Sequence, residues 1–285
     1  MIQENIGEAS QETPKAASAS VVAENAAMLK ALPFTDTADF DDAARGFLGS
    51  IDNAKITSAQ GRVVWSLEPY GFLSETEAPA TVNPSLWRQS RLNMQHGLFE
   101  VVPGVYQVRG LDIANMTLIE GERGVIVVDT LTSIEGARAA MELYFQHRGK
   151  RTVAAVIFTH THTDHWGGAR GVLDDAALAG GNIPIIAPNL FMEHAVSENI
   201  IAGPAMLRRA QYQFGPFLAK GHAARSIAVS ASRWRPGRWR YCARPISSSR
   251  PATSAPSMGS SLNSRWRRTA KRRQRCIFTW RATGS

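Results

Sequence analysis

The sequence has 285 residues, with 44% hydrophobic and 20% charged side chains and a formal net charge of +8, ordinary values for a globular protein of one large or two small domains. It has no run of about 18 apolar residues, no apolar leader and only two cysteines, Cys242 and Cys276, which argues against a membrane span, a secretion signal and a disulfide framework. We therefore expect a cytoplasmic protein, with a periplasmic or secreted location left open if the start codon is mis-assigned.

Two segments are expected before the main domain. Residues 1–25 are small, polar and poor in aromatic side chains, which is typical of disorder. Residues 26–95 are interpreted as a helical and extended lead-in. The apolar spacing from Glu24 to Leu48 indicates short helices broken at Pro33, because proline cannot continue a helix from its interior.

Residues 96–219 have the alternating pattern of an α/β domain. The predicted elements are, in chain order, strand pairs around turns at 103–104 and 121–124, a helix over 133–147, a strand over 153–159, a strand over 183–188 and a long amphipathic helix over 189–213. The strand over 153–159 is apolar throughout, which predicts burial on both of its faces. Polar residues gather where this buried strand ends.

A dense set of zinc ligands follows that strand, namely His160, His162, Asp164 and His165. In an extended segment His160 and His162 point to the same side, so that one metal can contact both. Asp164 and His165 can reach a second metal as the backbone turns. Two metals about 3.5–4 Å apart can share a hydroxide that acts as a nucleophile. We therefore predict that these four residues bind two Zn²⁺ ions, and that Asp164 is also catalytic.

Two features of this region allow alternatives. A histidine cluster can be a solvated loop or a tag, but here it lies between a buried strand and the Gly167–Gly168 turn, which favours a metal site. Asp129 ends an earlier strand at the same edge of the sheet. Its carboxylate can hydrogen-bond the ligand loop from behind the metals, or it can simply cap the turn after its own strand. Both interpretations of Asp129 stay open.

The motif HxHxDH after a buried strand, with an aspartate ending an earlier strand, resembles the metallo-β-lactamase superfamily of metal-dependent hydrolases. The flanking sequence is similar to the alkyl sulfatase branch over about residues 24–218. The segments that carry the similarity are GLFEVVPGVYQVRG, AVIFTHTHTDHWGGARGV and FMEHAVSENIIAGPAM. The resemblance implies an αββα sandwich, of which this chain carries the first half. It also implies cleavage of alkyl sulfates such as dodecyl sulfate into alcohol and sulfate.

The same resemblance implies that His160 and His162 bind one zinc, and that Asp164 and His165 bind the other. Two glutamates and a further histidine that complete the family's site would come from segments downstream. So would a helical dimerisation domain, through which the intact family forms homodimers, and a C-terminal domain similar to sterol carrier proteins. This chain has no glutamate after Glu198, so the resemblance cannot be extended beyond it.

The charge pattern changes towards the C-terminus. Residues 1–198 contain all 24 acidic and 14 of the 32 basic side chains, a net charge of −10, whereas residues 199–285 contain 18 basic and no acidic side chains, a net charge of +18. Such a composition is typical of a GC-rich gene read in the wrong frame. When synonymous codons are chosen for the tail and read in a frame shifted by one base, they can encode PTDLI and EAPAEMH. These segments resemble the alkyl sulfatase sequence that is expected to follow. We therefore interpret residues 220–285 as an out-of-frame tail without native structure, and expect the chain to be inactive.

Two other functions stay open. The chain can be another hydrolase of the same superfamily, such as a thioesterase, lactonase or nuclease, which would share the histidine loop but not the flanking text. It can also be a non-enzymatic basic protein whose tail, SRWRRTAKRRQR, neutralises nucleic-acid phosphates. We do not expect the latter, because the tail has no amphipathic period and no nucleic-acid-binding module.

Overall fold

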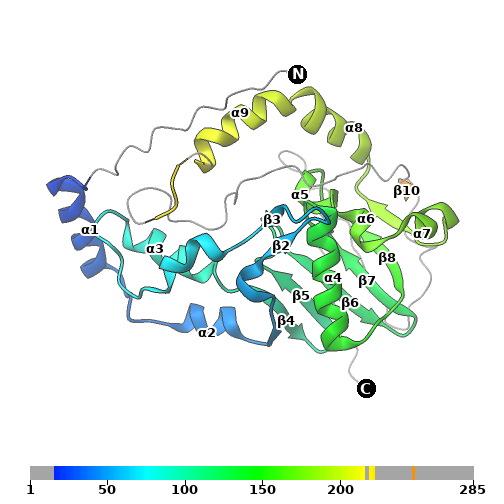
Figure 1. Ribbon diagram of the computed structural model, residues 1–285, viewed down its shortest axis with the longest axis horizontal. Coiled ribbons are helices and arrows are strands. Elements are labelled where there is room, and N and C mark those ends of the chain that lie inside the picture. Colours follow the sequence, from blue (N-terminus) through cyan, green and yellow to red (C-terminus); the bar gives the residue numbers. More distant parts are fainter. Residues whose placement is uncertain (1–15, 216–217, 222–245, 248–285) are drawn as a thin grey trace.

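The computed structural model describes residues 16–215, 218–221 and 246–247 (Figure 1). An eight-stranded mixed sheet forms its centre, in the order β1-β4-β5-β6-β7-β8-β9-β10, and β2 and β3 form a separate antiparallel pair. The strands are β1 (Phe47–Gly49), β2 (Ile56–Thr57), β3 (Val63–Trp65), β4 (Gly97–Val102), β5 (Val105–Arg109), β6 (Met116–Gly121), β7 (Gly124–Val128), β8 (Val153–Ile157), β9 (Ile185–Ala187) and β10 (Ile246–Ser247).

The sheet is antiparallel from β1 to β7 and parallel from β7 to β10. The helices are α1 (Ala19–Ala31), α2 (Ala38–Ala44), η1 (Asp52–Ala54), η2 (Glu68–Ser74), α3 (Pro84–Leu92), α4 (Ile134–Arg148), α5 (Thr163–Trp166), α6 (Ala169–Val172), α7 (Asp175–Gly180), α8 (Phe191–Val196), the π-helical turn η3 (Ser197–Ile201) and α9 (Gly203–Phe214). In Figure 1, α4 lies in front of the sheet, and α8 and α9 form an arm at the top.

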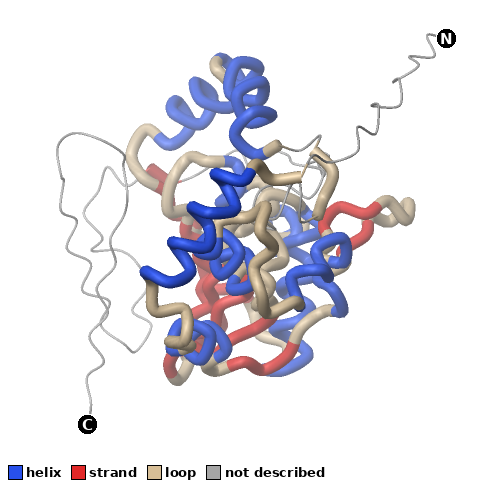
Figure 2. Tube along the Cα trace, turned by 90° about the vertical axis from the view of Figure 1, so that its left-hand side faces the viewer, coloured by secondary structure: helices blue, strands red, loops and turns tan. Residues whose placement is uncertain are grey.

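Helix α4 makes the crossover that two neighbouring parallel strands require, here between β7 and β8. It begins where the Ser133 hydroxyl accepts a hydrogen bond from the Gly136 backbone N–H at 3.0 Å, and it ends at Gly149, which has a φ of 77°. Ala137, Ala140 and Tyr144 are fully buried against the sheet. Viewed from the side, in Figure 2, a group of helices stays at the top of the molecule, above the strands.

The predicted strands and the helix over 133–147 are confirmed within a few residues at their ends. The described elements form a mixed α/β fold, as expected for the first half of the sandwich. In the part of the chain that the structure describes, no helix is both long and apolar enough to cross a bilayer.

Two sequence-based expectations need correction. Residues 1–25 were expected to lack structure, but α1 begins at Ala19 because the Ser18 hydroxyl caps it. The single helix over 189–213 is instead α8, η3 and α9, since the backbone widens at η3 and α9 restarts at Gly203 with Pro204 in its first turn, where proline is tolerated. The tail over 220–285, expected to lack native structure, contributes only the described residues 220–221 and the pair Ile246 and Ser247, which lie beside β9. Residues 222–245 and 248–285 of that tail lie outside the described residues.

Candidate metal centre

The loop that carries the predicted ligands is held against the end of β7. His160 and His162 follow β8, and α5 then carries Asp164 and His165. The Thr130 N–H donates to the His165 carbonyl at 2.8 Å, and the Gly168 N–H donates to the Leu131 carbonyl at 2.9 Å. These reciprocal bonds lock the ligand loop to the segment after β7.

Side chains cannot be accommodated at the turn that ends the loop. A Cβ added to Gly167 would overlap the Thr132 carbonyl, and one added to Gly168 would overlap the Thr130 and Ser133 carbonyls. The facing segment is itself strained, because Asp129 and Leu131 have φ values of 59° and 62°. A left-handed backbone is uncommon for a residue with a Cβ, costs on the order of 1–3 kcal/mol, and concentrates at functional sites.

The structure brings all four predicted ligands together. The ring centroid of His160 lies 4.6 Å from that of His162 and 4.0 Å from that of His165. His165 Nε2 lies 3.3 Å from Asp164 Oδ2. Two ligand atoms of a tetrahedral zinc, each about 2.0–2.1 Å from the metal, would lie about 3.3–3.4 Å apart. The spacing of His165 and Asp164 therefore fits two ligands of one zinc ion.

Asp129 contacts the ligand loop through both of its oxygens. Oδ1 accepts a hydrogen bond from the Thr159 N–H at 2.8 Å, while Oδ2 accepts from the Thr159 hydroxyl at 2.7 Å and lies 2.7 Å from His165 Nδ1. The Asp129 side chain is only 8% exposed. Of the two interpretations that the sequence left open, the carboxylate makes the contacts required by the first, since it reaches the loop and orients a ligand ring.

These contacts set the electrostatics of the cluster. Burial lowers the pKa of His165, but the hydrogen bonds to Asp129 and Asp164 outweigh burial and raise the pKa to about 9. Burial also raises the pKa of Asp164, yet the hydrogen bond from His165 brings the pKa below its ordinary value. The pKa of His160 is lowered by burial and by the two neighbouring imidazoles. His160 is thus kept neutral, the form in which a histidine binds a metal.

Among the residues that the structure describes, no three His, Cys, Asp or Glu side chains converge as a metal-binding group. Nε2 of His162 faces Glu198 at 2.9 Å, and both ring nitrogens of His165 face carboxylates. Hydrogen bonds and ion pairs within the cluster thus occupy one ring nitrogen of His162 and both ring nitrogens of His165. The donor set and the spacing of Asp164 and His165 nevertheless fit zinc.

Sequence reasoning missed Glu198 and Asn199, which approach the loop from η3. Glu198 contacts both His162 and the Thr161 hydroxyl, and Asn199 contacts Thr161 and Thr163. The sequence held no signal for them beyond their polarity, because the pattern predicted an uninterrupted helix there.

Asp112 was also missed. It accepts hydrogen bonds from the Thr132 N–H and hydroxyl at 3.0 and 2.7 Å, and burial raises its pKa to about 6.

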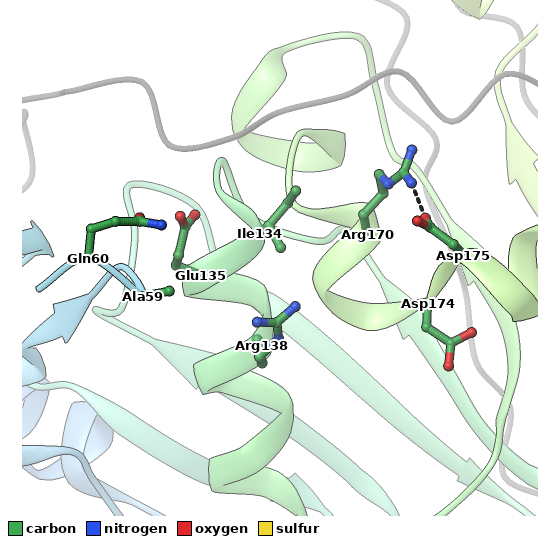
Figure 3. A pocket seen from close by; sticks show the side chains of 8 residues that line it. All are labelled: Ala59, Gln60, Ile134, Glu135, Arg138, Arg170, Asp174 and Asp175. Atoms are coloured by element: carbon green, nitrogen blue, oxygen red, sulfur yellow. Dashed lines mark hydrogen bonds and ion pairs between the residues drawn. The ribbon is translucent and has the colours of Figure 1, made fainter. Parts of the chain in front are cut away.

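A separate cavity of about 470 Å³ lies beside the start of α4 (Figure 3). Its lining residues are Ala59, Gln60, Ile134, Glu135, Arg138, Arg170, Asp174 and Asp175. Arg170 forms an ion pair with Asp175 across one side of it. The predicted metal ligands do not line this cavity, so we do not assign the chemistry to it.

Comparisons with known proteins bear on this geometry. Residues 109–221 match the Metallo-beta-lactamase superfamily. The chain is 53% identical over 210 residues to an (R)-specific secondary-alkylsulfatase of a Pseudomonas species, covering 74% of this chain and 32% of the relative. It is 49% identical over 227 residues to an alkyl/aryl-sulfatase of Saccharomyces cerevisiae, covering 78% of this chain and 35% of the relative.

A solved structure is also similar, that of the stereoselective inverting sec-alkylsulfatase from a Pseudomonas species. It superposes with a TM-score of 0.69 at 54% sequence identity, over 73% of this chain and 33% of that chain. The chain therefore spans about a third of the length of the relatives it matches. The family match over residues 109–221 includes the histidine loop and strands β6 to β9.

Proposed function

This chain belongs to the alkylsulfatase branch of the metallo-β-lactamase superfamily, and from that premise we propose that its sheet-edge site is built to hydrolyse alkyl sulfate esters into alcohol and sulfate. The observation that carries the proposal is that three imidazoles and one carboxylate lie close together just after β8. The identity of about one half to sulfatases over three quarters of the chain supports the substrate class.

We propose that two zinc ions are the cofactor. His160 and His162 would hold one, and Asp164 and His165 would hold the other. When bound, zinc supplies the Lewis acidity that offsets negative charge on a reacting sulfate ester. Asp164 belongs with the catalytic groups in this proposal, because its carboxylate, together with His165, would hold one of the two ions.

The chain's own residues would keep those ligands in place. Asp129 accepts from Nδ1–H of His165, which leaves Nε2 of that ring for the metal. Its second oxygen holds the Thr159 N–H, so the start of the loop and one of its ligand rings are fixed by one buried carboxylate. Trp166 donates its indole N–H to the Thr161 carbonyl at 2.9 Å, which holds the middle of the loop.

We further propose that the chain of 285 residues is itself inactive. All 24 acidic residues precede residue 199, so the downstream glutamate ligands implied by the family resemblance are absent in the printed reading frame. Metal binding and folding are linked, and loss of ligands weakens both. A one-base shift near residue 220, whether in the gene or in its reading, would account for the acid-free tail.

The test compares the chain of 285 residues with the protein that is translated when one base near codon 220 is corrected. Sulfate release from dodecyl sulfate should occur only in the corrected protein, with two zinc ions bound. The variant His160→Ala in the corrected protein should lose activity by at least about 100-fold, because a ligand to the reacting metal is lost. A corrected protein that binds zinc but hydrolyses a thioester or lactone instead would favour another hydrolase of the superfamily.

A further inference from the structure

Helix α8 is fixed to the base of the ligand loop by aromatic packing. Phe191 is 5% exposed, and its ring stacks on that of Phe158 at 5.6 Å and meets that of Trp166 edge-on at 6.2 Å. Ala195, one turn further along, is fully buried. Because Phe158 precedes the loop and Trp166 ends it, these contacts hold the start of α8 against both ends of the loop.

The helix widens where it passes over the loop. The Ala202 N–H donates to the Ser197 carbonyl at 2.9 Å, a spacing of five residues. Such π-helical turns cost hydrogen-bond quality and occur often at functional sites. No residue of η3 is buried, so packing in the core does not explain why the turn is kept.

Two consecutive side chains of this turn reach the loop. Glu198 Oε1 lies 2.9 Å from His162 Nε2, and Oε2 accepts from the Thr161 hydroxyl at 3.0 Å. Asn199 donates from Nδ2 to the Thr161 carbonyl at 3.2 Å, and its Oδ1 accepts from the Thr163 hydroxyl at 2.5 Å. Three successive loop residues are thus gripped by two neighbouring residues of η3.

Asn199 is in turn tied to its own helix. Its Nδ2 also donates to the Ala195 carbonyl at 2.8 Å, and that carbonyl belongs to the buried end of α8. Asn199 therefore connects the loop to the buried end of α8 as well as to the exposed turn η3.

We propose that Glu198 and Asn199 form a clamp that positions His162, and that Glu198 selects the tautomer of His162 that carries its proton on Nε2. With Nε2–H donated to Glu198, Nδ1 is the nitrogen left to bind a metal. This inference rests on the proposed function for its purpose, but the clamp itself is a contact of the chain alone. Glu198 would serve His162 as Asp129 serves His165, and such outer carboxylates fix the tautomer and orientation of metal-binding imidazoles.

The tautomer can be measured on the metal-free chain of 285 residues. Long-range ¹H–¹⁵N spectra of histidine-labelled protein at about pH 9, where an ordinary imidazole is neutral, separate the Nδ1–H from the Nε2–H form. We expect the Nε2–H form for His162. Glu198→Ala should shift it to a mixture of both forms. Glu198→Gln should restore the Nε2–H form, because its amide oxygen can accept from His162 while its NH₂ group donates to the Thr161 hydroxyl.

A matched control is available on α8. Glu193 is exposed, so Glu193→Ala removes the same charge close by without touching the loop, and it should leave the His162 spectrum unchanged. Because the Glu198 side chain is 25% exposed, its truncation leaves no core cavity, and a circular dichroism spectrum equal to that of Glu193→Ala will confirm folding. A folded Glu198→Ala protein with the parent tautomer ratio would overturn the inference.

Titration with Zn²⁺ against a chromogenic chelator separates this inference from the proposed function. Glu198→Ala should bind zinc about 10–100-fold more weakly than Glu193→Ala, the usual effect of losing an outer-shell partner of a metal ligand. If the parent chain binds no zinc but shows the Nε2–H tautomer and loses it in Glu198→Ala, the zinc site of this chain fails and the clamp stands. Equal zinc affinity in both variants, with an unchanged tautomer, contradicts the clamp.

Discussion

The two sides of the ligand loop are built in different ways. On the sheet side, Leu98, Met116 and Val127 are fully buried and the loop backbone interlocks with the segment after β7. On the other side, η3 and α9 contain no buried residue, and Ile201 and Tyr212 are 76% and 91% exposed. The sheet side is held by close packing, whereas η3 reaches the loop through the polar side chains of Glu198 and Asn199.

We therefore expect packing on the sheet side to fold the loop, and polar contacts from the arm to adjust the orientation of its side chains. Substitutions in a closely packed core are costly, because a change of even one methylene group there lowers the stability of the fold. Polar contacts at a partly exposed surface contribute about 0.5–1.5 kcal/mol each. Substitutions on the sheet side should therefore unfold the domain, and substitutions in the arm should alter the site with little loss of stability.

The largest effect is expected at Gly168. Gly168→Ala would place a Cβ against the Thr130 and Ser133 carbonyls and 2.8 Å from Ala137 Cβ, and overpacking of this kind costs about 1–3 kcal/mol or more. We expect at least the upper figure, measured by urea unfolding. The control Gly203→Ala lies at the start of α9 with no atom within 4 Å of the new Cβ, and it should not destabilise the chain. Equal midpoints for both variants would remove the distinction between the two sides.

A smaller but still large effect is expected at Asp129. Asp129→Ala removes three hydrogen bonds from a buried position and leaves the Thr159 N–H unpaired, which should cost about 2–4 kcal/mol. Asp129→Asn should cost less, since asparagine tolerates the left-handed backbone and its oxygen can still accept from Thr159. Thermal unfolding of both variants tests the order, and an Asn variant less stable than the Ala variant would contradict the assigned contacts.

The buried carboxylate of Asp112 gives the sheet side a pH dependence. Its pKa is raised by burial to about 6 in the folded chain, above the value of about 3.9 in an unfolded chain. The folded state thus binds the proton more tightly, so this group's contribution is complete below about pH 4 and is lost as the pH rises through 6, up to about 3 kcal/mol. Asp112→Asn should remove this contribution, and stability curves from pH 4 to pH 8 that are parallel in both proteins would contradict it.

The smallest effect is expected on the arm. Tyr212→Ser changes a side chain that is 91% exposed, and surface substitutions of this kind usually stay within about 0.5 kcal/mol. The unfolding midpoint should not move, while the tendency to associate should fall because the arm also exposes Ile201, Leu207 and Phe214. Urea unfolding checks the midpoint and analytical ultracentrifugation checks the association, each beside the parent chain. A shifted midpoint would show that the arm is packed after all.

The sheet was predictable from the sequence because its strands are apolar runs bounded by Gly and Pro. Strands β7 and β8 are short continuous apolar runs, and helix α4 has a local apolar pattern of period 3.6. The broken helix was harder to predict. Gly203 and Pro204 marked a boundary, but the widening at Ser197–Ile201 depends on contacts with a loop more than thirty residues away. A local pattern cannot report such a contact.

The candidate site was also predictable from the sequence only in part. His160, His162, Asp164 and His165 were found from spacing alone, and the structure brings them together. The contacts of Asp129 needed the structure to choose between two interpretations. Glu198 could not be found, because a single carboxylate on an amphipathic helix is usually solvated, and only the fold places it on His162.

The most direct test of the whole account is sulfate release from dodecyl sulfate by two zinc-supplemented proteins, the printed chain and the protein translated after a one-base correction near codon 220. The account predicts steady turnover by the corrected protein, loss of that turnover in its Asp164→Ala variant, and none by the printed chain. Turnover by the printed chain, or a corrected protein that binds zinc and leaves the ester intact, would contradict it.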